Sequence, residues 1–258
     1  MSQFESAGFE IAFDDIGARD ARTTIVLVHG FATNRRENWQ RLGWYSAYER
    51  KGVRAIALDC RGHGESAKPL DPSAYSRDAM AGDVLALIDH LGIEKADLMG
   101  FSMGARIALA SALKRPDRFG HLVLGGVGEK LFEPPRADNA MAEAMEAEDP
   151  DSIVDPLLRS FRYFADESHE NRLALAALSR ASLRFADGDG GWAACGNLHQ
   201  PVLVVAGAHD TLAGDPEPLA RAFPNGRAVT LPGCDHFSAI PHGLFKAAVF
   251  DFLDDSLE

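Results

Sequence analysis

The chain has 258 residues, of which 46% are hydrophobic and 25% are charged, a composition typical of a globular protein that can bury a core without disulfides. Its 38 acidic residues outnumber its 26 basic residues, and the formal net charge of −12 repels phosphate backbones and anionic lipid surfaces. We therefore expect neither nucleic acid nor a membrane as a partner.

The cysteines and the N-terminal residues indicate where the protein works. Cys60, Cys195 and Cys234 are an odd number without metal-binding spacing, which is typical of reduced thiols in the cytosol. The first residues contain neither a basic region nor an apolar run, and no apolar stretch is long enough for a membrane span. The sequence thus predicts a cytoplasmic protein, and we expect no metal and no cofactor.

Short apolar runs recur along the chain, with helical patterns between them. The runs cover residues 24–28, 53–58, 96–101, 122–127, 202–206 and 228–231. Continuous runs of this length are typical of strands that are covered on both faces, as in a parallel sheet. An earlier segment, residues 9–16, is expected to add an antiparallel hairpin at the edge.

Helices are expected at residues 76–92, 102–115, 216–223 and 242–253, the first of them capped by Ser76. The alternation of strand and helix predicts an α/β fold in which helices cover both faces of one mostly parallel sheet.

One long segment interrupts the alternation. Residues 129–198 contain no strand-like run, are rich in alanine, glutamate and leucine, and are punctuated by prolines. We expect short helices that form a cap inserted between two strands, with residues 1–128 and 199–258 as the core. The glycine-rich stretch 187–191 is predicted to be the hinge or exit loop of this cap.

Ser102 is the strongest candidate for a nucleophile. Residues 100–104 read Gly-Phe-Ser-Met-Gly, a pattern that is common by chance but here lies between a predicted strand and a predicted helix. A turn this sharp exposes the serine at the start of the helix, and the two glycines make room for neighbouring backbone. The alternative is a serine that only caps the helix.

A serine hydroxyl needs a general base, and the base needs an orienting carboxylate. His236 follows the last predicted strand, and Asp210 follows the strand at 202–206, so both are expected at the sheet edge where Ser102 lies. Glu129 competes with Asp210 for the carboxylate position. The alternative for His236 is an ordinary surface histidine.

Two backbone N–H groups are candidates for stabilising negative charge on a reacting oxygen. Met103 follows the nucleophile, and Phe31 lies in the His29-Gly30-Phe31 turn after the first central strand. The alternative for His29 and Gly30 is a plain turn at a strand end.

Together these motifs resemble the α/β-hydrolase superfamily over nearly the whole chain. The similar segments are Val-His-Gly-Phe at 28–31, Asp-Cys-Arg-Gly-His-Gly-Glu-Ser at 59–66, the elbow at 100–104, Gly-Ala-His-Asp at 207–210, and His236. The resemblance implies an eight-stranded, mostly parallel sheet with a helical cap over the active site. Relatives that hydrolyse epoxides or haloalkanes use aspartate as nucleophile, so Ser102 argues against both activities.

The resulting hypothesis is a serine hydrolase that cleaves small-molecule carboxylic esters through an acyl-enzyme. One alternative keeps the three side chains but hydrolyses carbon–carbon bonds in dienoic keto acids, whose negative charge would need a cation such as Arg35, Arg36 or Arg106. A second alternative is a receptor that only binds a small molecule on the same fold.

Aromatic residues of the predicted cap and its surroundings are candidates for substrate binding. They are Trp39, Phe132, Phe161, Phe164 and Trp192. Five further apolar residues could line the same pocket, namely Leu157, Leu158, Leu175, Leu178 and Phe185. For all of these residues the alternative is a packing role, such as holding the cap helices together.

Overall fold

The computed structural model describes residues 2–133, 139–181 and 191–254. Its centre is an eight-stranded sheet with the order β1-β2-β4-β3-β5-β6-β7-β8. The strands are β1 (Ser2–Ser6), β2 (Phe9–Ile16), β3 (Thr24–Val28), β4 (Arg54–Leu58), β5 (Ala96–Phe101), β6 (Phe119–Gly125), β7 (Val202–Gly207) and β8 (Gly226–Leu231). All pairs from β4 to β8 are parallel, and β2 is antiparallel to both of its neighbours. The predicted α/β class is confirmed.

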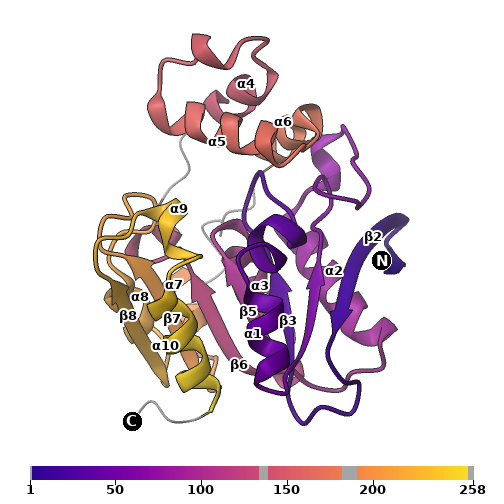
Figure 1. Cartoon of the computed structure of the whole chain (residues 1–258), viewed down its shortest axis with the longest axis vertical. Helices are drawn as coiled ribbons and strands as arrows, with labels where there is room; N and C mark the ends of the chain where they lie inside the picture. The colour runs from indigo at the N-terminus through magenta and orange to yellow at the C-terminus, as the bar shows by residue number, and fades with distance from the viewer. Residues whose placement is uncertain (1, 134–138, 182–190, 255–258) are drawn as a thin grey trace.

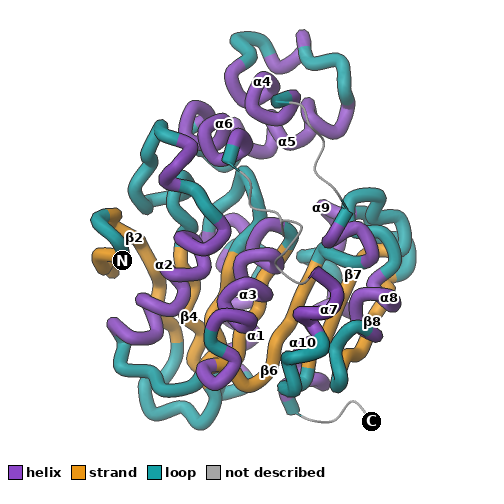
Figure 2. The backbone as a smooth tube through the Cα atoms, turned by 180° about the vertical axis from the view of Figure 1, so that it is seen from behind, coloured by secondary structure: helices purple, strands orange, loops and turns teal. Residues whose placement is uncertain are grey.

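Helices cover both faces of this sheet (Figures 1 and 2). The α-helices of the described residues are α1 (Trp44–Arg50), α2 (Arg77–His90), α3 (Met103–Lys114), α4 (Ala140–Glu146), α5 (Pro156–Glu167), α6 (Arg172–Arg180), α7 (Gly191–Cys195), α8 (Pro216–Arg221), α9 (His236–Ala239) and α10 (Gly243–Leu253). Residues of α2, α3 and α8 share one buried cluster with the sheet, and residues of α1 and α10 share another. Among the described residues, no helix has both the length and the apolar character to cross a bilayer.

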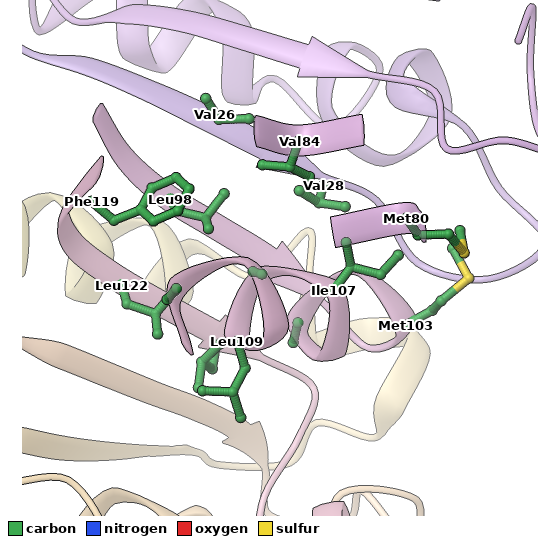
Figure 3. Packing of buried hydrophobic residues seen from close by; sticks show 14 of the residues in the cluster. Val26, Val28, Met80, Val84, Leu98, Met103, Ile107, Leu109, Phe119 and Leu122 are labelled. Atoms are coloured by element: carbon green, nitrogen blue, oxygen red, sulfur yellow. The ribbon is translucent and has the colours of Figure 1, made fainter. Parts of the chain in front are cut away.

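The two-residue period of the strands distributes the core between the two faces. Val26 and Val28 of β3 pack with Val84 of α2 and Ile107 of α3 (Figure 3), whereas Leu27 belongs to the cluster on the opposite face. Removing one such side chain from water contributes about 1.5–3 kcal/mol. This double burial explains why the central strands read as continuous apolar runs.

Three helices of the predicted insert lie beyond the carboxyl ends of the strands. Figure 1 shows α4, α5 and α6 at the top of the molecule, and they share a small apolar cluster that includes Met145, Ala165 and Leu175. The two ends of the insert instead contact the core. The short 3-10 helix Glu129–Phe132 contacts α8, and Cys195 of α7 is buried in a core cluster. Of the predicted hinge, residues 187–190 lie outside the described residues.

Glu170 connects the helices α4, α5 and α6, called the cap below, to the core. It lies between α5 and α6, and only 8% of its surface is exposed. Its Oε1 accepts a hydrogen bond from Asn34 Nδ2, and its Oε2 accepts one from the Gly64 N–H, both at 2.9 Å. Burial raises the pKa of Glu170 to about 7, although these two donors favour the carboxylate.

Candidate active site

Ser102 occupies the sharp turn between β5 and α3. Its φ of 55° and ψ of −112° are a strained combination for a residue with a side chain, and the turn is held by the Ser102 N–H, which donates to Gly125 O at 2.8 Å. A Cβ at Gly100 would lie 2.1 Å from Gly104 O, and a Cβ at Gly104 would lie 2.1 Å from Val28 O. Both flanking glycines are therefore required by close backbone approach.

His236 and Asp210 lie next to Ser102 in a continuous chain of hydrogen bonds. The Ser102 hydroxyl is 2.9 Å from His236 Nε2, and His236 Nδ1 is 2.8 Å from Asp210 Oδ2. The other carboxylate oxygen of Asp210 accepts from the N–H groups of Leu212 and Ala213. An ionised Asp210 thus orients Nδ1–H toward itself and leaves Nε2 free to accept the serine proton.

The loops after β7 and β8 are joined by their backbones, which brings Asp210 to His236. The His209 N–H donates to Cys234 O and the Ala208 N–H donates to Leu231 O, both at 2.8 Å. Asp235 then caps the short helix α9, because its side chain accepts from two backbone N–H groups and Ser238 completes the capping box. The Asp-x-x-Ser pattern at 235–238 is the sequence signal for this helix cap.

Glu129 does not contact His236. Its N–H donates to Asp215 O at 2.8 Å, and its carboxylate accepts from the Asp215 N–H at 3.4 Å. Among the carboxylates considered, the structure brings Asp210 and not Glu129 to the histidine.

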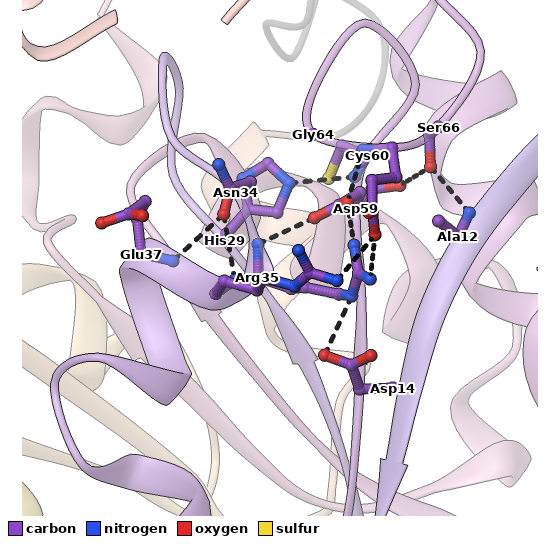
Figure 4. A network of polar contacts seen from close by, with 12 residues as sticks. Ala12, Asp14, His29, Asn34, Arg35, Glu37, Asp59, Cys60, Gly64 and Ser66 are labelled. Carbon is purple, nitrogen blue, oxygen red and sulfur yellow. Dashed lines mark hydrogen bonds and ion pairs between the residues drawn. The ribbon is translucent and has the colours of Figure 1, made fainter. Parts of the chain in front are cut away.

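The turn at 29–31 lies beside the serine, and two buried histidines hold it. His29 Nε2 accepts from the Cys60 N–H at 2.9 Å, and His63 Nε2 accepts from the Ala32 N–H at 3.2 Å (Figure 4 shows His29 beside Cys60). Burial lowers the pKa of both histidines, which keeps them neutral acceptors. No acceptor among the described residues pairs with the N–H of Phe31 or of Met103.

Arg35 does not bind substrate in this arrangement. Its side chain is 1% exposed and forms ion pairs with Asp14 and Asp59 (Figure 4) and with Glu65, and these carboxylates raise its pKa. The prediction of Arg35 as a substrate anchor is therefore wrong, because the buried guanidinium is already neutralised by carboxylates that are distant in sequence. Arg36 lies on the surface, half exposed, and pairs with Glu65 at 3.2 Å.

Three of the predicted aromatic residues pack against protein and do not line the cavity next to Ser102, which is called the main cavity below. Trp39 is fully buried, with its ring 5.8 Å from that of Trp44 in an edge-on contact. Phe132 and Trp192 contact each other, with ring centroids 4.8 Å apart. Their alternative role, packing, is the one that the structure supports. Phe161 lines the main cavity, and Phe164 lines a smaller cavity beside it.

The main cavity has a volume of about 590 Å³ and lies between the cap and the strand ends. Ser102 and His236 line it from the core, together with Phe31 and Met103. The cap contributes apolar side chains to it, namely Met141, Leu157, Phe161 and Leu178. Arg106 and Lys130 also line it. In the described part of the chain, no three His, Cys, Asp or Glu side chains are grouped as a metal site.

Comparison with known proteins agrees with the fold. A family model described as the alpha/beta hydrolase fold matches residues 23–176. A dihydrolipoyllysine-residue acetyltransferase component of an acetoin cleaving system from Pseudomonas putida is 35% identical over 224 residues, which are 83% of this chain and 58% of that protein. This chain thus spans little more than half the length of that relative.

Two further proteins match over most of both chains. A 2-hydroxymuconate semialdehyde hydrolase from Pseudomonas sp. (strain CF600) is 32% identical over 225 residues, which are 80% of this chain and 78% of that protein. The crystal structure of an enol-lactonase from Burkholderia xenovorans LB400 superposes with a TM-score of 0.79 at 25% identity and covers 98% of this chain and all of that one.

Proposed function

The chain belongs to the α/β hydrolase fold family, and from that premise we propose that it hydrolyses small carboxylic esters through an acyl-enzyme. The observation that carries the proposal is the hydrogen-bonded chain from Ser102 through His236 to Asp210, which opens onto a largely apolar cavity. This is the arrangement that a serine nucleophile requires.

The proposed reaction has two halves. Ser102 Oγ attacks the ester carbonyl while His236 Nε2 takes its proton, and the N–H groups of Phe31 and Met103 stabilise the oxyanion. His236 then gives this proton to the leaving alcohol, and the acyl group stays on Ser102. In the second half His236 deprotonates water, the hydroxide oxygen attacks the acyl carbonyl, and Ser102 departs with the proton.

The apolar cap side chains support an ester substrate of modest size. Contact with Met141, Leu157 and Leu178 stabilises the acyl or alkyl group of an ester. The carbonyl is the only part of such a substrate that needs polar groups. The similar structure is named as an enol-lactonase, and a lactone is a cyclic ester, so this likeness supports the same class of bond.

A second candidate is hydrolysis of a carbon–carbon bond in an anionic dienoic keto acid. Arg106 and Lys130 both line the cavity and supply positive charge, with Arg106 held by Leu131 O at 2.8 Å and Lys130 by Thr211 O at 2.9 Å. The likeness to a 2-hydroxymuconate semialdehyde hydrolase favours this alternative. A panel of p-nitrophenyl esters, lactones and coloured dienoates distinguishes the two, because an esterase produces p-nitrophenol rapidly and leaves the dienoate unbleached.

The decisive test of the serine mechanism is the Ser102→Ala variant. Its turnover of p-nitrophenyl esters should fall by about 10⁴-fold or more, as removal of a nucleophile does in related mechanisms. A fluorophosphonate probe should label the unaltered protein and not the variant. Ser111→Ala, which removes a buried hydroxyl from the middle of α3, is the matched control and should keep both properties.

Full activity in Ser102→Ala would exclude the proposed nucleophile. A wild-type protein that is neither labelled nor active, but binds small molecules, would instead favour the receptor hypothesis.

A further inference from the structure

Ser102 and His236 lie between two cavities and not at the end of one. Besides the main cavity, they line a smaller one of about 30 Å³, a volume that suits a single water molecule. The two cavities have in common Ser102, His236, Phe31 and Phe161. A molecule in the smaller cavity therefore reaches Ser102 and His236 from a different side than a molecule in the main cavity.

Two polar side chains that line this smaller cavity each have one unpaired polar atom. Thr33 is 1% exposed and Asn38 is 5% exposed. Asn38 Oδ1 accepts from the Gly30 N–H at 3.2 Å, which fixes the orientation of the amide, since an N–H must face an oxygen. Asn38 Nδ2 and Thr33 Oγ1 then have no hydrogen-bond partner among the described residues.

Unpaired buried polar atoms are costly, and they are usually satisfied by a bound water when the space allows. Here an amide donor and a hydroxyl, which can both donate and accept, meet at a cavity of one-water size. Apart from the reacting pair Ser102 and His236, the other side chains that line this cavity are apolar, Phe164, Phe237 and Ile240 among them. A volume of about 30 Å³ has room for a water molecule and not for a larger polar ligand.

We propose that Thr33 and Asn38 bind the water molecule that hydrolyses the acyl-enzyme. The inference rests on the proposed function, because it assigns the source of water for its second half. The water gives one proton to His236 Nε2, and its oxygen forms the new bond to the acyl carbon. The bond from that carbon to Ser102 Oγ then breaks, and Oγ takes the proton from His236. Thr33 and Asn38 are positioning residues in this step, since they act through the water.

Thr33→Val tests the proposal because it removes the hydroxyl and nearly preserves the shape of the side chain. A single turnover with p-nitrophenyl acetate is followed by p-nitrophenol release and by intact-mass detection of the acetylated protein. We expect an unchanged rate of acylation and a decay of the acetyl-enzyme that is about three- to tenfold slower, the effect of one lost hydrogen bond.

Asn38→Asp is the second variant, since it keeps an oxygen for the Gly30 N–H and removes both amide donors. Its rates are compared with those of wild type on the pH-independent plateau of each protein's rate profile. It should slow deacylation and spare acylation in the same way. Ser111→Ala again serves as the matched control, with both rates unchanged.

The outcomes separate this inference from the function on which it rests. Unchanged deacylation in both variants overturns the water site while leaving the acyl-enzyme intact. Slower acylation or a raised KM, with normal decay, also overturns it, because the two residues would then bind substrate. Wild-type protein that forms no acetyl-enzyme contradicts the proposed function itself.

Discussion

The two carboxylate oxygens of Asp210 have different partners. Oδ2 faces the His236 ring, and Oδ1 accepts from the N–H groups of Leu212 and Ala213. These two donors prevent the carboxylate from rotating, so one fixed oxygen defines which nitrogen of the histidine carries hydrogen. The role of Asp210 is thus orientational as well as electrostatic.

Asp210→Asn tests this orientation. The amide oxygen should remain with the two N–H donors, which places the amide NH₂ against His236 Nδ1 and forces the hydrogen onto Nε2. A histidine in that tautomer cannot accept the serine proton, and kcat for ester hydrolysis should fall by about 10⁴-fold. Steady-state kinetics with a p-nitrophenyl ester measure the change. A decrease of less than tenfold would show that Asp210 does not set the tautomer.

The candidate site was predictable at residue level where the chain order and strand ends determine it. Ser102, Asp210 and His236 each follow a strand that the apolar pattern reveals, and the structure brings them within hydrogen-bond distance. The predictions for Arg35 and Trp39 were wrong for a physical reason. The carboxylates that pair with Arg35 come from distant parts of the chain, and nothing in the local sequence shows that Arg35 and Trp39 are buried.

At the scale of elements, the pattern of apolar runs located the six predicted strands and the hairpin strand β2. It did not reveal β1, whose five residues are mostly polar and which pairs only with β2. Helix α1 was also missed, because it has seven residues and begins without a side-chain cap. Short elements of this kind form through tertiary packing and not through local preference.

Glu170 makes the junction between the cap and the core sensitive to pH. Its pKa is about 7 in the folded protein against an ordinary value of 4.5, so between these values the folded state holds a proton that the unfolded chain has lost. The contribution of Glu170 to the free energy of unfolding therefore falls as the pH rises through that window. Above a pH of about 7 the loss is complete.

Glu170→Gln removes this titration. The stability of the variant relative to wild type should increase with pH across the window, by as much as about 3 kcal/mol. Urea unfolding at a series of pH values measures the difference. Glu167→Gln, on an exposed position of the same segment, is the control, and parallel stability curves for Glu170→Gln and wild type would contradict the prediction.

At the scale of the molecule, the sheet and the cap contribute different parts of the site. The sheet supplies every reacting side chain from the carboxyl ends of its strands, and the cap supplies apolar walls from α4, α5 and α6. The α/β architecture was readable from the sequence for this reason, since strand ends carry the motifs. The shape of the cavity was not, because it depends on how the cap helices pack.

The strained backbone at Ser102 also concerns the molecule as a whole, because its cost of about 1–3 kcal/mol lowers the stability of the entire fold. Ser102→Gly should relieve the strain and so stabilise the fold. Part of this gain is lost, because glycine makes the unfolded chain more flexible. Relative to Ser102→Ala, which keeps the Cβ, it should melt a few degrees higher, about 2–4 °C for each kcal/mol in a chain of this size. Differential scanning calorimetry measures the two variants, and equal or reversed melting temperatures would disprove the effect.

Heat resistance and reactivity are therefore opposed at this one position. A descendant of this protein that no longer needed the chemistry would gain thermal stability by a single change to glycine. Persistence of serine there in a lineage that lives at high temperature would be a sign that the reaction is still under selection.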